Sequence, residues 1–349
     1  MNKLAVVILN WNGAEMLHRF LPSVTNYSQG EGIVVYVADN ASTDNSKAIV
    51  EKEFPTVRWI QLEWNYGFAE GYNKALSQIE AEYYLLLNSD VEVARDWLVP
   101  LLEYMDAHPD TAACQPKLLS YKNRKMFEYA GACGGFIDRY GYPFCRGRMF
   151  DTIESDEGQY NTVASVFWAS GAALMVRAAD YWKVNGLDGR FFAHMEEIDF
   201  CWRLHNLGKK IVCIPQSTVY HVGGATLNKT NPRKTFLNFR NNLLMLYKNL
   251  PEEDVKPVLS TRHFLDNIAL VKFYLSGNKG DAQAVIKARK EFKTMLPKFK
   301  ETRETILENK VAGTIPEIYQ GSILAAYYLK GIKKFSDFQA FTKTLTLPS

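Results

Sequence analysis

The sequence predicts an α/β protein with a mostly parallel sheet and helices on both faces, followed by a helical C-terminal region. Strand-length apolar runs alternate with helix-length segments four times within the first part of the chain, which is typical of parallel strands joined by helices. Several of these runs are apolar throughout, as in strands that are buried on both faces. Beyond residue 242 the apolar residues recur at helical spacing and the composition becomes basic.

The N-terminal part of the chain supplies the first strands and helices. We expect strands at Leu4–Trp11, Ile33–Asn40, Val57–Leu62 and Tyr83–Asn88, and helices at Gly13–Ser23, from after Asp44 to Glu53, and at Gly67–Ile79. Pro22 and Pro55 are expected to end the first two helices. Neither a GxGxxG fingerprint nor a GxxxxGK[ST] loop follows a strand, so we expect neither a dinucleotide site nor a P-loop.

The middle of the chain is expected to complete the sheet. Glycines and aromatic residues recur in 111–160, which favours a loop or hairpin insertion rather than the sheet core. Strands are expected within Val163–Arg177 and at Ile211–Tyr220, and a helix follows the acidic segment at 196–199.

The C-terminal part of the chain is predicted to be helical. Amphipathic segments lie at Leu243–Leu250, His263–Leu275, Ala282–Leu296 and Ile315–Leu329, separated by Pro251, Pro257, Gly277, Pro297 and Gly313. We therefore expect a catalytic domain at 1–242 and a helical extension at 243–349.

The charge balance restricts the partners of the protein. The net charge is +3, which gives no case for nucleic acid, but residues 243–349 hold 17 basic and 11 acidic side chains. Two interpretations of the C-terminal helices stay open: they pack on the catalytic domain or a second subunit, or they lie on a membrane surface. Five cysteines without a CxxC pair predict a reducing, cytoplasmic location. Peripheral contact with the cytoplasmic face of the inner membrane is the alternative within this prediction.

Three oxygen-bearing side chains follow the most apolar strand. Asn88, Asp90 and Glu92 occupy alternate positions, so they face one side of an extended segment. Open α/β sheets bind ligands at the carboxyl ends of their strands, and Mg²⁺ or Mn²⁺ takes oxygen ligands that it shares with a substrate diphosphate. We expect Asp90 to hold such a cation; a solvated acidic turn is the alternative.

Three other strand ends carry candidate ligand groups. Asn10 and Asp39 end the first two strands, where their side chains are suited to hydrogen-bond a base or a ribose. A turn or helix-capping role is the alternative for Asp39. His221 ends the last predicted strand and precedes a glycine turn, which makes it a candidate metal ligand, with a structural histidine as the alternative.

A dense acidic group begins the helix after residue 195. Glu196, Glu197 and Asp199 fall within four residues. Acids are favoured at helix N-termini, and Asp199 also forms an i,i+4 pair with Arg203. The density exceeds what capping requires, and crowded like charges raise a carboxyl pKa toward that of a general base. Catalytic and structural interpretations both stay open.

In this order the motifs resemble those of the inverting family 2 glycosyltransferases of GT-A fold, especially bacterial rhamnosyltransferase-like members. The resemblance covers about residues 4–242. It is carried by Val7–Gly13, Val37–Asp44, Asn65–Asn73, Leu86–Asp90, Trp168–Gly171, Glu196–Asp199 and His221. It implies transfer of a sugar from a UDP- or dTDP-sugar to a saccharide or lipid-linked saccharide, in cell-surface polysaccharide or O-antigen synthesis.

The resemblance also implies roles for single positions. The nucleotide or donor would contact Leu9, Asn10, Trp11, Asp39, Asn65, Gly67, Asn73, Asn88 and Ser89, and the sugar or acceptor would contact Trp168, Ser170 and Gly171. Asp90 and His221 would hold Mg²⁺ or Mn²⁺. Glu197 falls at the position of the catalytic base, but it is Glu where the family has Asp, so Glu196 and Asp199 remain rivals.

A second departure from the family pattern concerns the metal motif, and two other functions remain as alternatives. Asn88 stands where some members carry the first Asp of the metal motif, and Glu92 is the candidate to supplement it. This favours slightly a degenerate GT-A-like protein that binds saccharide or scaffolds an assembly, whereas the intact acidic group opposes that function. A sugar nucleotidyltransferase would need a basic glycine-rich loop where this chain has Asn10–Gly13.

Overall fold

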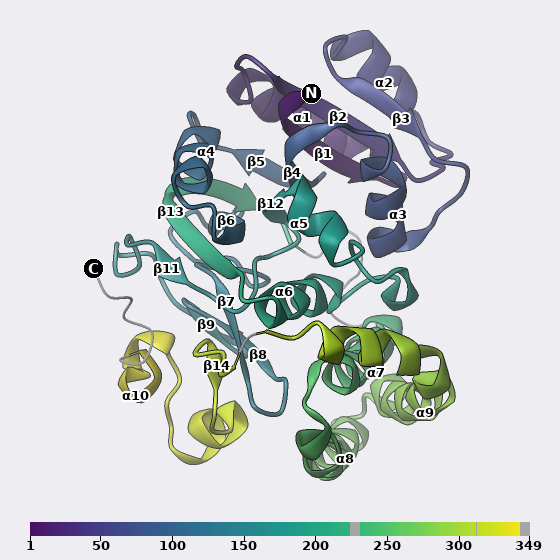
Figure 1. Ribbon diagram of the computed structural model, residues 1–349, viewed down its shortest axis with the longest axis vertical. Helices are drawn as coiled ribbons and strands as arrows, with labels where there is room; N and C mark the ends of the chain where they lie inside the picture. The colour runs from purple at the N-terminus through teal and green to yellow at the C-terminus, as the bar shows by residue number, and fades with distance from the viewer. Residues whose placement is uncertain (224–230, 312, 343–349) are drawn as a thin grey trace.

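The computed structural model describes residues 1–223, 231–311 and 313–342 (Figure 1). Within these ranges the main sheet has nine strands, in the order β11-β13-β6-β12-β4-β1-β2-β3, with β5 beside β13. The strands are β1 (Asn2–Asn10), β2 (Ile33–Asp39), β3 (Arg58–Gln61), β4 (Ala81–Asn88), β5 (Val91–Val93), β6 (Thr111–Ser120), β11 (Ala164–Ser165), β12 (Ala173–Arg177) and β13 (Lys210–His221). Strands β1 to β4 pair in parallel, and β12 lies antiparallel between β4 and β6. The predicted α/β class is confirmed.

Helices cover both faces of this sheet because successive side chains of the buried strands point to opposite sides. In β1, Leu4, Val6 and Ile8 share one core with residues of α1 (Ala14–Tyr27), α2 (Ser46–Glu53) and α4 (Leu98–Ala107). Ala5 and Val7 share the other core with α3 (Gly67–Leu76), α5 (Ala178–Lys183) and α6 (Glu196–Asn206). The first helix continues through Pro22, so the expectation that it ends there was wrong.

The prediction that 111–160 is an insertion is only partly correct. Strand β6 pairs with β13 in parallel and with β12 in antiparallel, so its residues belong to the main sheet. The remainder forms part of a second, five-stranded sheet, counted over the described residues: β10 (Thr152–Ile153), β9 (Arg148–Met149), β8 (Pro143–Cys145), β7 (Gly135–Asp138) and β14 (Ile318–Tyr319).

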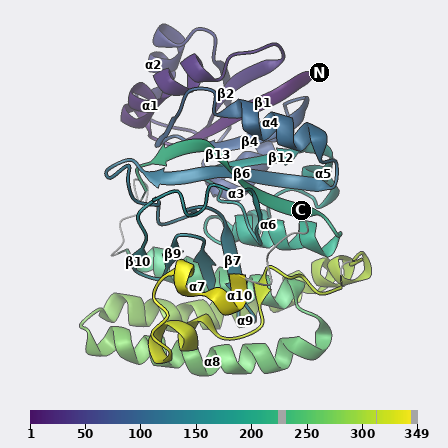
Figure 2. The same ribbon diagram turned by 90° about the vertical axis from the view of Figure 1, so that its left-hand side faces the viewer.

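Three long helices follow the sheet: α7 (Pro232–Asn249), α8 (Glu252–Leu275) and α9 (Lys279–Glu308). They lie together at the end of the molecule opposite α1 and α2 (Figure 2). Pro257 and Pro297 lie inside α8 and α9 rather than between helices.

The predicted helix at Ile315–Leu329 is wrong. Ile318 and Tyr319 form β14 and pair in parallel with Ile137 and Asp138 of β7, because the edge of the second sheet offers these residues backbone partners. From there to residue 342, where the described part of the chain ends, the elements are short: the π-helix η2 (Ala325–Leu329), the 3-10 helix η3 (Phe335–Asp337) and α10 (Gln339–Thr342).

The C-terminal helices share a core with the sheet domain. Leu243, Leu244 and Leu246 of α7 lie in the same buried cluster as Phe200 of α6 and Phe299 of α9. Residue 242 lies inside α7, and the division of the chain at this position stays a prediction. In the described part of the chain, none of the helices combines the length with the apolar character needed to cross a bilayer.

Candidate active site

Strand pairing brings Asp90 and His221 together. β5 follows directly after Asp90 and pairs antiparallel with the end of β13, so that Val91 lies opposite His221. The His221 Nε2 atom is 3.1 Å from Asp90 Oδ1, and its Nδ1 atom is 3.4 Å from Glu128 Oε1. The Asn88 amide nitrogen is 3.5 Å from the same Nε2 atom. All four side chains therefore meet at the carboxyl end of β4.

The charges of this group reinforce one another. Burial alone would lower the pKa of His221, but the carboxylates of Glu128 and Asp90 outweigh it and raise the pKa to about 10. Burial alone would raise the pKa of Asp90, but the hydrogen bond with His221 outweighs it and lowers the pKa. Without a bound cation, the pair is therefore an imidazolium and a carboxylate.

The donor set fits a divalent cation that is shared with a substrate. Asp90 offers a carboxylate and His221 a ring nitrogen at one point, and Glu128 lies on the other ring nitrogen, as a carboxylate behind a metal-binding histidine does. Over the described ranges, no group of three or more His, Cys, Asp or Glu side chains is arranged so that it could hold a metal ion by itself. Mg²⁺ commonly takes its remaining ligands from substrate phosphates and water. Glu92, the expected supplement, instead pairs with Arg124 at 2.8 Å.

The acidic turn before α6 has an unusual backbone. Phe192, His194 and Met195 have φ angles of 66°, 70° and 72°, a region that costs a non-glycine residue about 1–3 kcal/mol. Helix α7 holds this segment. The side-chain amide of Asn241 donates to the carbonyls of Phe191, Ala193 and His194 at 3.0, 2.9 and 2.7 Å. A residue of the C-terminal helices thus fixes the path of the chain into the turn.

Three buried polar atoms of the turn lack a hydrogen-bond partner among the residues that the structure describes: His194 Nε2, Glu196 Oε2 and Glu197 Oε2. Such groups are rare in native proteins and need an explanation. Burial, and then the charges of Glu197 and Asp199, raise the pKa of Glu196 well above its usual range. Burial raises the pKa of Glu197 to about 7, and it lowers the pKa of His194 to about 4. Glu197 is therefore poised to exchange a proton near neutral pH.

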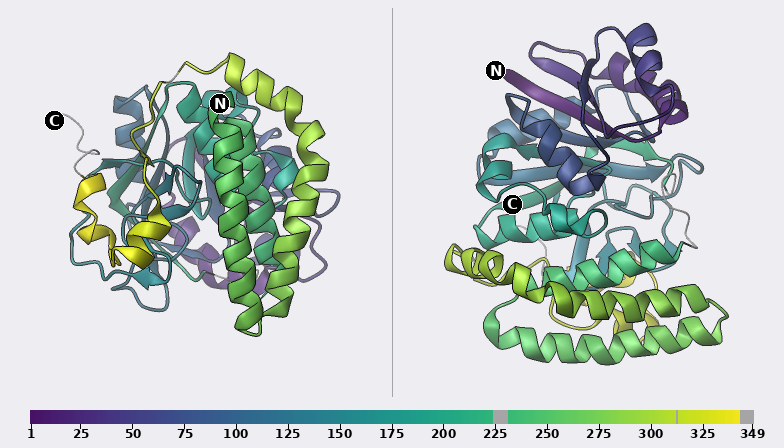
Figure 3. Two further views of the ribbon diagram at one scale, coloured as in Figure 1. Left: turned by 90° about the horizontal axis from the view of Figure 1, so that it is seen from below. Right: turned by 90° about the vertical axis from the view of Figure 1, so that its right-hand side faces the viewer.

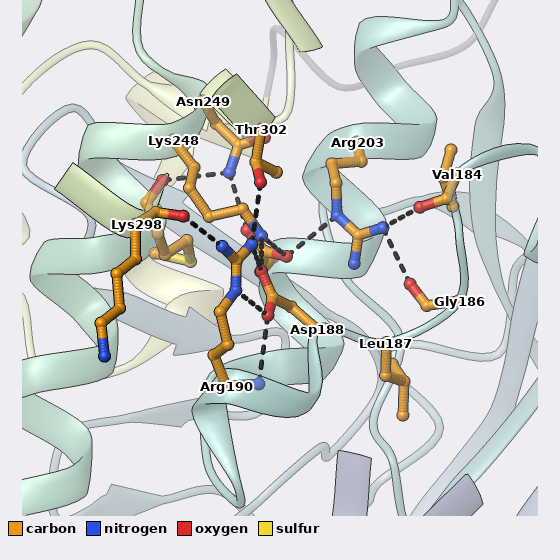
Figure 4. Close-up of polar contacts among 12 residues, drawn as sticks. Val184, Gly186, Leu187, Asp188, Arg190, Arg203, Lys248, Asn249, Lys298 and Thr302 are labelled. Atoms are coloured by element: carbon orange, nitrogen blue, oxygen red, sulfur yellow. Dashed lines mark hydrogen bonds and ion pairs between the residues drawn. The ribbon is translucent and has the colours of Figure 1, made fainter. Parts of the chain in front are cut away.

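Asp199 has both carboxylate oxygens bound by other residues of the protein, which disfavours it as the base; the choice among the three acids stays a prediction. Asp199 is fully buried, and its Oδ2 atom accepts from Arg203 Nε at 2.9 Å and from Lys248 Nζ at 2.8 Å. Its Oδ1 atom accepts from the Asn249 amide at 2.9 Å. Lys248 also reaches Asp188 at 2.6 Å, in a network that Figure 4 shows with Arg190 and Arg203. Arg203 of α6 and Lys248 and Asn249 of α7 therefore hold the Asp199 carboxylate between these two helices.

The segment 170–172 links the two acidic groups. The Asn88 N–H donates to the Ala172 carbonyl at 3.0 Å, and a Cβ atom at Gly171 would lie 3.8 Å from the Glu197 Cβ. The loop that carries Glu128 also touches this segment, because a Cβ atom at Gly131 would lie 2.6 Å from the Ser170 Cβ. The structure therefore brings the predicted base and the predicted metal ligands to the same end of β4.

The first two strands end in a polar network. The Asn10 amide donates to Asp39 Oδ1 at 2.9 Å and to Ser42 Oγ at 3.1 Å, and Gln61 donates to Asp39 Oδ2 at 3.0 Å. Within the described residues, the buried Asn10 Oδ1 has no partner, which leaves an acceptor for a ligand. A Cβ atom at Gly13 would lie 2.4 Å from this Oδ1 and 3.8 Å from Ser89 Oγ, so Ser89 lies at the same edge of the sheet.

The other predicted donor residues divide into two groups. Trp11 is half exposed after β1 and has a free face, and Leu9 packs close to Gly71 of α3. Asn65 accepts from the Gly67 N–H at 2.9 Å, and Gly67 has a φ angle of 79° and packs so closely on Phe192 that a side chain would clash. These two residues shape the loop before α3.

Asn73 and Trp168 are fully occupied by the protein. The Asn73 amide bonds Tyr181, Glu70 and both backbone groups of Leu187, which uses its whole hydrogen-bonding capacity. Trp168 is buried and donates to the Phe136 carbonyl at 3.1 Å. Ser170 is also buried, and its N–H donates to Gln115. These three side chains are held within the protein, and their predicted contacts with donor, sugar or acceptor stay predictions.

The sequence interpretation missed Glu128, His194 and Asn241. Glu128 lies in the segment that was expected to be an insertion, and Asn241 lies at the expected end of the domain. His194 stands two residues before the acidic group, and its position beside an acidic cluster was the one signal that could have found it. The other two are recognised only by their long-range contacts.

Comparison with known proteins identifies a matching sequence family and several similar proteins. Residues 5–150 match the sequence model described as "Glycosyl transferase family 2". The N-acetylglucosaminyl-diphospho-decaprenol L-rhamnosyltransferase of Mycobacterium tuberculosis (strain ATCC 25618 / H37Rv) is 26% identical over 234 residues, which are 62% of this chain and 75% of the relative. Rhamnosyltransferase WbbL of Escherichia coli (strain K12) is 25% identical over 217 residues, covering 59% of this chain and 76% of the relative.

Solved structures share the fold. S. aureus TarS 1-349 in complex with UDP-GlcNAc superposes with a TM-score of 0.54 at 18% identity, covering 88% of this chain and 89% of that one. The mannosyltransferase PcManGT from Pyrobaculum calidifontis, in complex with GDP-Man and Mn²⁺, gives a TM-score of 0.51 at 14% identity, covering 88% and 84%. At these identities the likeness concerns the fold alone.

Proposed function

We propose that the chain is a family 2 glycosyltransferase, which transfers a sugar, with inversion, from a nucleoside-diphosphate donor to a saccharide or lipid-linked saccharide in cell-surface glycan synthesis. The names of the relatives support this acceptor class, since one acts on a diphospho-decaprenol-linked sugar. A nucleoside diphosphate as the donor part agrees with the complexes of the structural neighbours.

One observation carries the proposal. The Asp90–His221 pair and the Glu196–Glu197 turn lie on either side of the segment 170–172, which contacts both β4 and Glu197. A donor diphosphate at Asp90 would present its anomeric carbon toward the turn. The exposed Trp11, the free Asn10 Oδ1 and the network around Asp39 line the neighbouring strand ends, where a nucleotide would lie.

In the proposed reaction, the Glu197 carboxylate accepts the proton of an acceptor hydroxyl. The hydroxyl oxygen forms a bond to the anomeric carbon while the bond between this carbon and the diphosphate oxygen breaks. The nucleoside diphosphate leaves from the opposite face with the electron pair, so the configuration inverts. The sugar passes through oxocarbenium-like character, as in glycoside hydrolysis, and a base with a pKa of about 7 is matched to neutral conditions.

Asp90 and His221 are the residues that would hold a divalent cation, Mg²⁺ or Mn²⁺, whose chemistry is to neutralise the negative charge of the donor diphosphate. Asp90 is ionised at neutral pH because its pKa is lowered. Glu128 fixes the orientation of the His221 ring from its other nitrogen. Burial and the charges of Glu197 and Asp199 raise the pKa of Glu196, which favours its uncharged form beside Glu197 and limits like-charge repulsion there.

The test is a panel of sugar nucleotides with and without Mn²⁺. Binding of the right donor raises the melting temperature, and that donor is then hydrolysed slowly without acceptor and consumed quickly with it. The anomeric configuration of the product is read by NMR. A donor that binds but is never cleaved would instead make the chain a saccharide-binding or scaffold protein.

A further inference from the structure

Helix α8 carries apolar side chains on the face that is turned away from the protein. Phe264, Ile268, Val271 and Leu275 follow one another at helical spacing on one side of the helix, and each is more than half exposed. A surface helix normally keeps its apolar residues on its inner face. α8 lies at the outer end of the molecule, where it faces the viewer in the left panel of Figure 3.

Near this stripe, the basic side chains are mostly exposed, whereas the acidic ones are paired within the protein. Between residues 256 and 300, all of which the structure describes, the exposed charged side chains are lysines: Lys256, Lys272, Lys279, Lys287, Lys290, Lys293, Lys298 and Lys300. The acids of this stretch are turned inward. Asp266 is buried and pairs with Arg262 and Arg289, Asp281 accepts from Thr235, and Glu291 pairs with Arg240.

The turn η2 extends the same surface. Tyr328 and Leu329 are exposed, and the Lys272 ammonium of α8 lies 5.7 Å from the centre of the Tyr328 ring. Lys333 lies 5.3 Å from the same ring. Two segments that are 50 residues apart in sequence thus combine exposed apolar groups with lysines at one end of the molecule.

We propose that the α8 stripe and the lysines of α8 and α9 dock the protein onto an anionic phospholipid bilayer. Apolar side chains inserted at the headgroup boundary and flanking lysines on phosphates are what an interfacial helix requires. A second copy of this chain is a poor occupant, because two such faces would bring the lysines of 256–300 against one another, while the exposed acids of α8 and α9 lie at their ends, at 252–253 and 301–308. Docking goes beyond the proposed function, since it needs neither donor nor acceptor, and it would hold the enzyme where a lipid-linked acceptor resides.

The test is co-sedimentation of the full chain with vesicles. Vesicles of equal parts phosphatidylglycerol and phosphatidylcholine should bind the protein, and pure phosphatidylcholine vesicles or high salt should release it. Lys287→Gln/Lys290→Gln should weaken binding roughly fivefold for each lysine. Phe264→Ser/Ile268→Ser should also weaken binding, because the charge is kept but the inserted groups are lost. Val99→Ser, which removes an exposed apolar side chain from α4, is the matched control and should bind like the wild type.

Two outcomes would overturn the docking proposal. Equal sedimentation of the wild type and both double variants would exclude this surface. A wild type that ignores both vesicle types but is dimeric by light scattering, and becomes monomeric in Phe264→Ser/Ile268→Ser, would assign the stripe to a second copy. Donor hydrolysis measured without vesicles tests the proposed function separately, since these substitutions lie outside the candidate active site.

Discussion

The side-chain amide of Asn241 lies 2.7 Å from the carbonyl oxygen of His194 and donates a hydrogen bond to it. The same amide contacts the carbonyls of Phe191 and Ala193, so one side chain of α7 supports a backbone segment with three positive φ angles. Each such angle costs about 1–3 kcal/mol and persists only when neighbours impose it. The C-terminal helices therefore position the acidic turn.

Asn241→Ala should reduce turnover about 100-fold, because relaxation of the strained segment displaces Glu197, and a shift of roughly 1 Å at a reacting group has this effect. Donor affinity measured by calorimetry should stay unchanged. The control is Asn238→Ala, since among the described residues the Asn238 amide bonds the Lys234 carbonyl of its own helix and nothing in the turn. Equal turnover in both variants, with both folded by circular dichroism, would remove Asn241 from the positioning role.

The two glutamates of the turn should respond differently to amide substitution. Glu197→Gln should lower turnover at least ~100-fold, the usual scale for loss of a general base. Glu196→Gln should have an effect below about 10-fold, because burial and the neighbouring acids raise the pKa of Glu196 and favour its protonated form, which an amide replaces closely. Steady-state kinetics at saturating donor measure the turnover of both variants and show which glutamate matters more. The reverse order would assign the base to Glu196.

The pH profile follows from the pKa of Glu197. Its pKa of about 7 predicts that turnover falls tenfold for each pH unit below about 7 and is level above it, because only the ionised form accepts a proton. The same shift affects stability. The folded state holds the proton more tightly than the unfolded chain, whose pKa is near 4.5, so this contribution is complete below pH 4.5 and is lost as the pH rises to about 7. Melting curves of Glu197→Gln should lack this loss.

Most of the main sheet could be predicted from local sequence. The predicted and observed strands at β1, β2 and β4 agree to within about two residues, because strands buried on both faces are apolar at successive positions. Strand β6 was missed because Gln115, Pro116 and Lys117 interrupt it. Its position between β12 and β13 depends on contacts with segments distant in sequence. The buried Lys117 ammonium is tolerated there because it pairs with Asp156 at 2.8 Å.

Site residues could be predicted only where several ionisable side chains lie close together in the sequence. Glu196 and Glu197 stood out because three acids fall within four residues, but the same density gave no means to separate them from Asp199. The three acids differ because Asp199 pairs with Arg203 and with Lys248, 49 residues further on, whereas one carboxylate oxygen of Glu196 and one of Glu197 have no hydrogen-bond partner among the described residues. Glu128 offered no local signal at all, since its partner His221 lies 93 residues away.

Asp90→Asn should abolish Mn²⁺-dependent donor binding, because it removes the carboxylate that pairs with His221. Calorimetry of the donor nucleotide with and without Mn²⁺ measures this, and the loss should exceed about 10-fold, the lower limit for disturbing a metal site. Glu92→Gln is the control: Glu92 pairs with Arg124, so its loss should leave cation binding intact. Unchanged affinity in Asp90→Asn, or equal losses in both variants, would move the cation elsewhere.

Asp199→Asn separates structure from chemistry in the acidic group. Asp199 is fully buried and bonds Arg203, Lys248 and Asn249, so removing its charge leaves cations in the interior without their partner. Breaking such a buried pair costs about 3–5 kcal/mol, which chemical denaturation should show as a lower free energy of unfolding. Glu70→Gln removes one side of the exposed Glu70–Lys74 pair and should cost no more than about 1 kcal/mol. If Asp199→Asn kept full stability and lost all turnover, Asp199 would act in the reaction itself, and its contacts with α7 would serve to tune that carboxylate.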